Sequence, residues 1–277
     1  MSHEAVTVAC IQMEPRIGET QRNVVHSLAL IDRAADQGAR LIVLPELCNS
    51  GYVFASAEEA WSLAEDAASG PSIRAWAAKA AERDLHIVAG FCERAGDTLY
   101  NAAVVIGPGG VLGTYRKMHL WDQENRFFAR GDIGFPVFDL PFGRIGVLIC
   151  YDGWFPESYR ACALQDADIV CVPTNWVPMA RQPANRDVMA NILAMGAAHT
   201  NAVFIAAADR VGIERGQKFL GRSLIVSPDG WPLSGPASDE KEEILLAAID
   251  PAKARQARQL NEFNHVLNDR RAGAYRS

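Results

Sequence analysis

Two similar stretches of sequence decide the fold: Gly38-Ala-Arg-Leu-Ile-Val-Leu-Pro45-Glu46 and, later in the chain, Asp166-Ala-Asp-Ile-Val-Cys-Val-Pro173-Thr174. Four consecutive apolar residues in each stretch predict a strand that is buried on both faces. A segment of helical period precedes each strand, and a proline ends it and opens a loop. The pattern predicts an α/β fold built from two related halves. If a pseudo-twofold relates them, the residues after both prolines converge at one sheet edge, where α/β folds usually bind ligands.

The same alternation of short apolar runs and helical segments extends over the rest of the chain. We predict strands over 6–11, 40–44, 86–91, 100–106, 111–117, 137–140, 144–149, 168–172, 203–208, 220–227 and 244–249, and helices over 22–37, 72–83, 156–165 and 186–200. No linker divides these elements, so a single domain over residues 1–277 is expected. The charged tail after Pro251 is expected either to cover the body or to reach a second subunit.

Composition narrows the class of protein. The 277 residues are 49% hydrophobic and 22% charged, which is typical of a folded globular chain. A net charge of −6 argues against a nucleic-acid partner. No apolar run approaches the roughly 18 to 20 residues of a membrane helix, and the N-terminus lacks the pattern of a signal peptide. We therefore expect no membrane association and a cytoplasmic location.

The cysteines and histidines are scattered. The six cysteines form no Cys-x-x-Cys pair, and the six histidines form no close ligand pair. We therefore expect neither disulfides nor a metal site.

Three strand ends carry a polar residue where burial would be costly. Glu46 follows the first proline, Lys117 lies in Tyr115-Arg-Lys-Met-His-Leu120, and Cys150 ends Ile145-Gly-Val-Leu-Ile-Cys150. Each residue alone has an ordinary structural interpretation, as a helix cap, a solvated lysine or an inert buried thiol. The cysteine, however, lies where a strand turns toward a helix, the position that presents a nucleophile in hydrolases.

Taken together, these segments resemble the nitrilase superfamily of carbon–nitrogen hydrolases over nearly the whole chain. The family's second glutamate matches Glu124, which precedes Phe127-Phe-Ala-Arg-Gly-Asp132. The resemblance implies a four-layer αββα sandwich that pairs into an αββα–αββα homodimer. It implies catalysis by Glu46, Lys117, Glu124 and Cys150, without a metal or an organic cofactor.

The chemistry of these residue types agrees with that assignment. A free thiol has a pKa of about 8.5 and needs a base, for which Glu46 is the candidate. Lys117 and the backbone N–H of Tyr151 are expected to receive the negative charge that develops on the substrate oxygen. Glu124 is expected to hold Lys117. One ammonium between two carboxylates does not also neutralise a permanent thiolate, so the resting thiol is expected to be neutral.

The residues around the cysteine favour one branch of the superfamily. Cys150-Tyr-Asp, followed by Phe155-Pro-Glu157, is more similar to amidases and carbamoyl amidohydrolases than to nitrilases proper. We predict hydrolysis of a small amide to a carboxylic acid and ammonia through a cysteine thioester. The alternatives are an N-carbamoyl amidohydrolase, which releases ammonia and CO2, a nitrilase, and a non-catalytic binding protein on the same fold.

Residues near the strand ends are expected to line the substrate pocket: Tyr52, Phe54, Tyr151, Trp154, Asn175 and Trp176. The two tryptophans among them suggest that an apolar or aromatic part of the substrate binds there.

His119 is expected to order its loop by hydrogen bonds rather than to act as the base. Arg181 and Arg186 could bind a substrate carboxylate, but loop arginines are usually solvated or paired.

Overall fold

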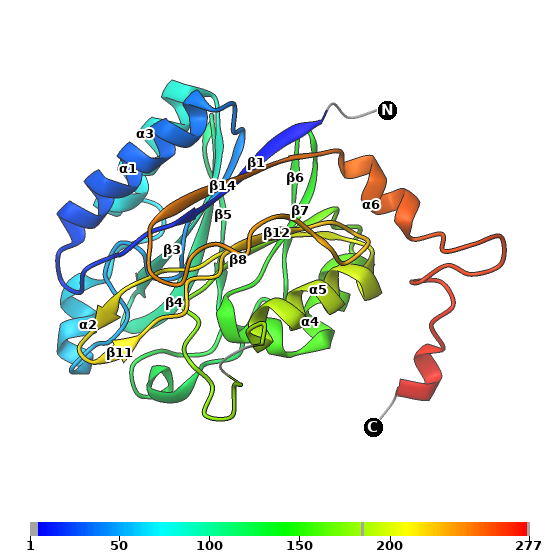
Figure 1. The fold of residues 1–277 in the computed structure, drawn as a ribbon. Coiled ribbons are helices and arrows are strands. Elements are labelled where there is room, and N and C mark those ends of the chain that lie inside the picture. The colour runs from blue at the N-terminus through cyan, green and yellow to red at the C-terminus, as the bar shows by residue number, and fades with distance from the viewer. Residues whose placement is uncertain (1–4, 184–185, 276–277) are drawn as a thin grey trace.

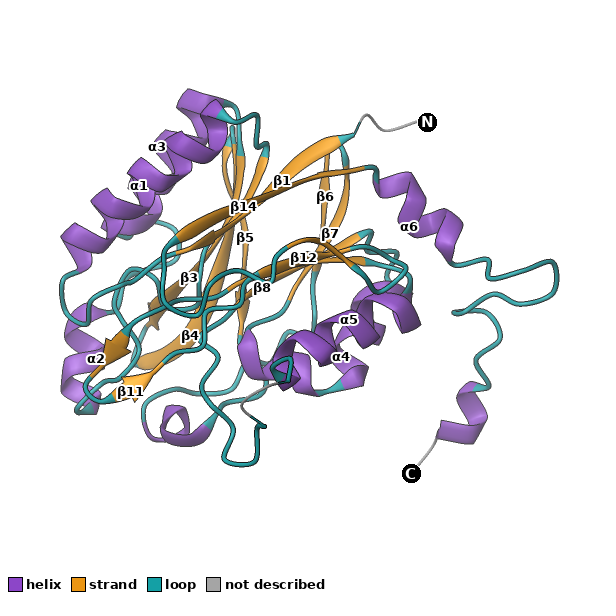
Figure 2. Cartoon of the chain, viewed as in Figure 1, coloured by secondary structure: helices purple, strands orange, loops and turns teal. Residues whose placement is uncertain are grey.

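The computed structural model describes residues 5–183 and 186–275, and two six-stranded sheets dominate this part of the chain (Figure 1). The first sheet has the order β14-β1-β2-β3-β4-β5, and the second has the order β13-β12-β9-β8-β7-β6. Helices cover the outer sides of the two sheets (Figure 2). This arrangement confirms the predicted four-layer αββα sandwich.

The elements have the following bounds. The first sheet contains β1 (Val6–Gln12), β2 (Leu41–Val43), β3 (His86–Ala95), β4 (Thr98–Gly107), β5 (Gly110–Arg116) and β14 (Glu243–Ile249). The second contains β6 (Val137–Leu140), β7 (Gly143–Val147), β8 (Ile169–Pro173), β9 (Phe204–Ala208), β12 (Leu224–Val226) and β13 (Pro232–Ser234). The α-helices are α1 (Thr20–Asp36), α2 (Ala57–Leu63), α3 (Pro71–Arg83), α4 (Pro156–Leu164), α5 (Met189–Asn201) and α6 (Pro251–Ala257). Shorter elements are the hairpin β10 (Ile213–Glu214) and β11 (Gln217–Lys218) and the 3-10 helices η1 (Asp122–Arg126), η2 (Cys150–Trp154) and η3 (Ala272–Tyr275).

The two sheets repeat one topology. In each, three strands run parallel, β1-β2-β3 in the first and β7-β8-β9 in the second, with antiparallel strands on both sides. By this order β2 corresponds to β8, and these are the strands that lead into Pro45 and end at Pro173. The internal relation predicted from the two proline-terminated stretches is therefore confirmed.

Alternation along β2 explains why both of its faces are apolar. Leu41 and Val43 belong to the core between the two sheets, whereas Ile42 and Leu44 pack with residues of α1 and α3. Trp76 of α3 is fully buried in that outer core, and its indole N–H donates to the Ser27 hydroxyl of α1 at 2.9 Å. The strand ends are thus fixed from both sides, which gives the residues that follow them defined positions.

Several boundaries differ from the sequence predictions. The strand predicted over 220–227 is shorter, because Gly221 and Arg222 both have a φ of +63°, which is incompatible with an extended strand. The helix predicted from residue 186 begins at Met189. The elements α2, β10, β11, β13 and α6 were not predicted, because elements of two to seven residues carry too little periodicity.

The C-terminal tail covers the body at its start. In α6, Arg255 contacts the buried carboxylate of Asp168 at 2.8 Å, and just beyond it Arg258 contacts Asp166 at 2.6 Å. Farther on, the tail runs away from the sheets (Figure 1), and Phe263 is 81% exposed.

The homodimer stays a prediction, as does the cytoplasmic location. Among the helices of the described ranges, none is both long and apolar enough to cross a membrane.

Gly90 of β3 allows the chain after β2 to approach closely. A Cβ atom at Gly90 would lie 2.5 Å from both the Glu46 Cα and the Pro45 carbonyl oxygen, so the backbone that carries Glu46 would have to move. We expect Gly90→Ala to lower the free energy of unfolding in urea by about 1–3 kcal/mol. Gly109→Ala is the matched control, because nothing lies within 4 Å of its added methyl group. Equal stability of the two variants would contradict this account.

Candidate active site

Glu46 lies just beyond the end of β2, and its side chain is fully buried. The Asn101 side-chain amide donates to Oε1 of Glu46 at 2.7 Å, while Oε2 has no hydrogen-bond partner among the residues described. The Asn175 side chain, after the corresponding strand β8, donates to the Glu46 backbone carbonyl at 2.9 Å. The segments after the two prolines therefore converge, as the sequence predicted.

Lys117 directly follows β5 and is fully buried between two carboxylates. Its Nζ lies 2.6 Å from Glu46 Oε1 and 2.7 Å from Glu124 Oε1. The Tyr52 hydroxyl donates to the same Glu124 oxygen at 2.6 Å, and the backbone N–H of Trp121 donates to the other at 3.1 Å. An ammonium has three N–H groups; two of them meet these carboxylates, and among the residues described the third has no hydrogen-bond partner.

Cys150 opens η2, where the chain leaves β7 and turns toward α4. Its φ of +44° lies in the left-handed region, which residues with a side chain seldom adopt. Leu47, next to Glu46, has a φ of +47°. Backbone strain of this kind concentrates at functional sites, where the surrounding structure maintains it. The structure thus presents the thiol and the glutamate on two strained turns.

Burial controls the ionisation of the acid and the amine. Burial raises the pKa of Glu46 to about 7, against the opposing effect of Lys117. For Lys117, burial works to lower the pKa, but Glu124 and Glu46 together raise it above its ordinary value. The amine therefore stays charged, while Glu46 is able to gain or lose a proton near neutral pH.

The Cys150 thiol belongs to the same electrostatic group. Burial and the Glu46 carboxylate raise its pKa well above the ordinary value, and the nearby Lys117 ammonium offsets only part of this. The direction of this shift agrees with the prediction of a neutral resting thiol. Nucleophilic attack then requires proton removal, and Glu46 is the acid–base group coupled to the thiol.

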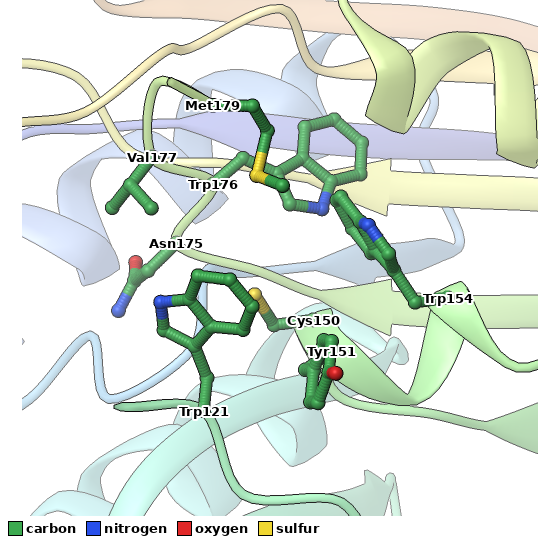
Figure 3. Close-up of a pocket in the computed structure, with 8 residues that line it drawn as sticks. All are labelled: Trp121, Cys150, Tyr151, Trp154, Asn175, Trp176, Val177 and Met179. Carbon is green, nitrogen blue, oxygen red and sulfur yellow. The ribbon is translucent and has the colours of Figure 1, made fainter. Parts of the chain in front are cut away.

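A small pocket opens in front of the thiol (Figure 3). It is lined by Trp121, Cys150, Tyr151, Trp154, Asn175, Trp176, Val177 and Met179. Four of the residues predicted to bind substrate, Tyr151, Trp154, Asn175 and Trp176, are therefore pocket residues. Figure 3 shows the Cys150 sulfur among the three indole rings.

Other predicted residues lie elsewhere. Tyr52 and Phe54 line a neighbouring pocket that includes Glu124, and Tyr52 acts there as a hydrogen-bond donor to that carboxylate. Arg186 lines a separate cleft with Lys218 and Arg222, and Arg181 is exposed. The structure therefore places neither arginine against Cys150.

Three pocket residues were missed from the sequence: Trp121, Val177 and Met179. Trp121 lies between Lys117 and Glu124, both of which were predicted to be catalytic, and that position was the available signal. Val177 and Met179 lie in the loop beyond Trp176, which has no periodicity that could indicate their direction. In the parts of the chain that the structure describes, no cluster of His, Cys, Asp and Glu could hold a metal ion.

Asp152 joins the cysteine turn to the lysine loop. One of its oxygens accepts from the Ile149 backbone N–H at 2.9 Å and from the Tyr115 hydroxyl at 2.7 Å. The other accepts from the backbone N–H of His119 at 3.0 Å and lies 2.8 Å from its ring Nδ1. Because β5 ends at Arg116, His119 does not follow Lys117 into the site, and it orders the loop as the sequence predicted.

We expect Asp152→Asn to destabilise the protein, because an amide nitrogen would face donors that now meet a carboxylate oxygen. The free energy of unfolding in urea should fall by about 1–3 kcal/mol for the buried unsatisfied group. Asp139→Asn is the matched control, since its carboxylate is 82% exposed and pairs only with Arg144 among the residues described. A loss no greater than that of the control would show that Asp152 does not hold the two loops.

Comparison with known proteins agrees with this geometry. The family model described as carbon-nitrogen hydrolase matches residues 7–259. A protein named nitrilase from Pyrococcus abyssi is 44% identical over 270 residues, which cover 98% of this chain and 99% of that protein. A protein named N-carbamoylputrescine amidase from Solanum lycopersicum is 34% identical over 288 residues, which cover 98% and 94% of the two chains.

Solved structures show the same fold. An amidase from Nesterenkonia AN1, of the nitrilase superfamily, has a TM-score of 0.80 at 26% identity over 99% of this chain and 96% of its own. A glutamate-to-glutamine variant of that amidase carries the acetamide moiety of fluoroacetamide on its active-site cysteine. A carbon–nitrogen hydrolase from Helicobacter pylori has a TM-score of 0.82 at 27% identity over 99% and 97% of the two chains. The family match over most of the chain, with the fold and the buried Glu–Lys–Cys group, establishes that this protein belongs to the carbon–nitrogen hydrolases of the nitrilase superfamily.

Proposed function

We propose that the protein hydrolyses the C–N bond of a small amide to a carboxylic acid and ammonia, through a thioester on Cys150. The observation that carries this proposal is the buried Lys117, which pairs with Glu46 and Glu124 beside the electrostatically coupled thiol. A non-catalytic binding protein would have no need for a buried ammonium with an unused N–H group, which is costly to maintain. The structures of related amidases support the same reaction class.

In the first step, the Cys150 sulfur attacks the amide carbon while the unpartnered Oε2 of Glu46 takes the thiol proton. Negative charge then develops on the former carbonyl oxygen. The remaining N–H of Lys117 and the backbone N–H of Tyr151 receive this charge. Tyr151 is in the first turn of η2, where backbone N–H groups have no partner within the helix. Removal of one such donor typically lowers turnover by about 10²–10³-fold.

In the second step, the C–N bond breaks, and Glu46 gives its proton to the nitrogen, which leaves as ammonia. The ionised Glu46 then takes a proton from water, and the oxygen of that water attacks the thioester carbon. Breakdown of this intermediate releases the carboxylic acid and returns the proton to the cysteine sulfur. Glu124 keeps Lys117 in place throughout, because it accepts from Nζ, from Tyr52 and from the Trp121 backbone.

An N-carbamoyl amidohydrolase is the second candidate. The same steps at a carbamoyl carbon would give ammonia and a carbamate, which then loses CO2. Relatives named N-carbamoylputrescine amidase, 34% identical to this chain, favour this alternative. Nitriles should also be tested as substrates, because one relative is named nitrilase.

Catalytic variants test the reaction. We expect Cys150→Ala and Glu46→Gln to abolish ammonia release, and Lys117→Ala to reduce it by at least about 10²–10³-fold. His119→Asn should retain measurable turnover, because His119 acts only on the loop. A folded Cys150→Ala variant with undiminished release of ammonia would disprove the thioester route, as would the absence of an acyl adduct on Cys150 by mass spectrometry under rapid quenching.

The pKa of Glu46 predicts the pH profile. The carboxylate must be ionised to take the thiol proton, and burial raises its pKa from the usual value to about 7. We therefore expect kcat/KM to fall as pH drops through about 7, by about tenfold per unit, instead of near the pKa of about 4.3 of an exposed glutamate. Initial rates between pH 5 and pH 9 measure this. A profile that stays flat down to pH 5 would exclude Glu46 as the base.

A further inference from the structure

Tyr52 is held at three points. Its hydroxyl donates to Glu124 Oε1 at 2.6 Å, and the Lys117 ammonium contacts the same oxygen at 2.7 Å. Its ring meets the Phe219 ring edge to face, with centroids 5.8 Å apart, and its backbone N–H donates to Glu214 Oε1 at 2.7 Å. Tyr52 therefore connects Glu214, which has no part in the proposed steps, with the carboxylate that holds Lys117.

Glu214 holds the backbone of the loop that carries Tyr52. It ends the short strand β10 and is 5% exposed. Its Oε1 accepts from two consecutive backbone N–H groups, those of Tyr52 and Val53, both at 2.7 Å. The loop packs closely on this carboxylate, because a Cβ atom at Gly51 would lie 2.9 Å from Glu214 Oε2. Hydrogen bonds to a charged acceptor are stronger than those between neutral groups, so the carboxylate fixes the direction of the backbone at Tyr52.

Arg210 compensates the charge of Glu214. It lies just beyond β9 and is 1% exposed. Its guanidinium donates to Glu214 Oε2 at 2.9 Å and to the Pro15 backbone carbonyl at 2.7 Å, and it lies 4.1 Å from the centroid of the Phe219 ring. The two oxygens of Glu214 thus have separate partners, Arg210 on one side and the Tyr52 loop on the other.

Stability alone does not explain a buried ion pair of this kind. Replacement of such a pair by apolar residues of similar volume is often neutral or stabilising. An apolar pair at Arg210 and Glu214 would, however, offer no acceptor to the two N–H groups of the Tyr52 loop. The acceptor is therefore the feature that distinguishes this ion pair from an apolar contact.

We propose that Glu214 is a positioning residue for the hydrolysis, because it holds the Tyr52 backbone so that the Tyr52 hydroxyl reaches Glu124. Glu124 in turn holds Lys117, which receives the developing charge. Glu214 lines neither the pocket in front of the thiol nor the neighbouring pocket, so it acts through Tyr52. The inference rests on the proposed function and adds a residue on which the reaction depends from outside the site.

Two double variants isolate the acceptor. Arg210→Met with Glu214→Gln, the glutamine variant, removes both charges and keeps an oxygen that accepts from the Tyr52 loop. Arg210→Met with Glu214→Leu, the leucine variant, removes both charges and the oxygen. Neither leaves an unpaired buried charge, so both are expected to fold.

Ammonia release measures the effect of the acceptor on turnover. The kcat of the leucine variant should be about 10–100-fold below that of the glutamine variant, because a small misplacement of a catalytic group is costly. KM should agree within about threefold, because Lys117 acts mainly on charge that develops in the transition state. Equal kcat in the two folded variants, or a difference confined to KM, would overturn the inference.

Tyr52→Phe tests the route of the effect. In the glutamine variant it removes a hydrogen bond to a charged acceptor, so kcat and the urea midpoint of unfolding should both fall. In the leucine variant that bond is already lost, so the same change should alter neither quantity. Equal losses in the two variants would show that Glu214 does not act through Tyr52.

Glu214→Asp gives a second test if the leucine variant does not fold. It keeps the charge beside Arg210, but its side chain is one methylene shorter and cannot reach both Arg210 and the Tyr52 loop at the present distances. We expect kcat to fall by about tenfold or more. Wild-type kcat in folded Glu214→Asp would overturn the inference.

Glu65→Gln is the matched control for a buried carboxylate. Glu65 is 8% exposed and accepts from the backbone N–H and the hydroxyl of Ser72 in α3, at 2.7 and 2.6 Å. The control should lower the urea midpoint and leave kcat within about twofold of wild type, because this carboxylate holds no catalytic group. A loss of kcat as large as that of the leucine variant would show that turnover follows stability alone, and would overturn the inference.

The urea measurement separates the two proposals. If no amide, carbamoyl compound or nitrile releases ammonia, the proposed function fails, but the midpoints still report on Glu214. A midpoint that Tyr52→Phe lowers in the glutamine variant and not in the leucine variant supports the role of Glu214 in holding Tyr52. Equal lowering refutes that role without any turnover, and normal ammonia release with equal kcat refutes it while the proposed function stands.

Discussion

A buried ammonium between two carboxylates is the interaction on which the site depends. Lys117 is fully buried, and removal of one partner of such a group typically costs about 3–5 kcal/mol, because it leaves an uncompensated charge. The ion pairs with Lys117 therefore constrain the loops that carry Glu46 and Glu124. The surrounding donors, from Asn101, Tyr52 and the Trp121 backbone, satisfy further carboxylate lone pairs.

The repeated topology explains how residues far apart in the sequence reach this ammonium. The chain leaves β2 at Glu46 and leaves the corresponding strand β8 at Asn175, and a hydrogen bond joins the two exits. One half thus supplies the acid, and the other supports its backbone and supplies the pocket wall at Trp176. Cys150 enters from the neighbouring strand β7. The loops that follow β2 and β8 therefore lie together, but they carry different residues and have different roles.

The strands and the reactive residues could be predicted from the sequence because both leave local signals. A strand that is apolar on both faces has a distinct pattern, and a charged residue at its end is costly enough to be informative. The shape of the pocket leaves no such signal. Trp121 and Met179 lie in loops whose direction depends on contacts with other segments, and for the same reason the sequence did not indicate that Tyr52 lines the neighbouring pocket. The hydrogen bonds of Asp152 likewise depend on tertiary structure alone.

Charge balance determines the resting state of the buried cluster. The site already holds two acids and one amine, and burial keeps the thiol neutral and raises the pKa of Glu46 to about 7. A thiolate would add negative charge to a buried group that has a single cation, so the mechanism proposed above couples proton transfer to attack. The neutral thiol therefore follows from the limited charge that this buried cluster can stabilise.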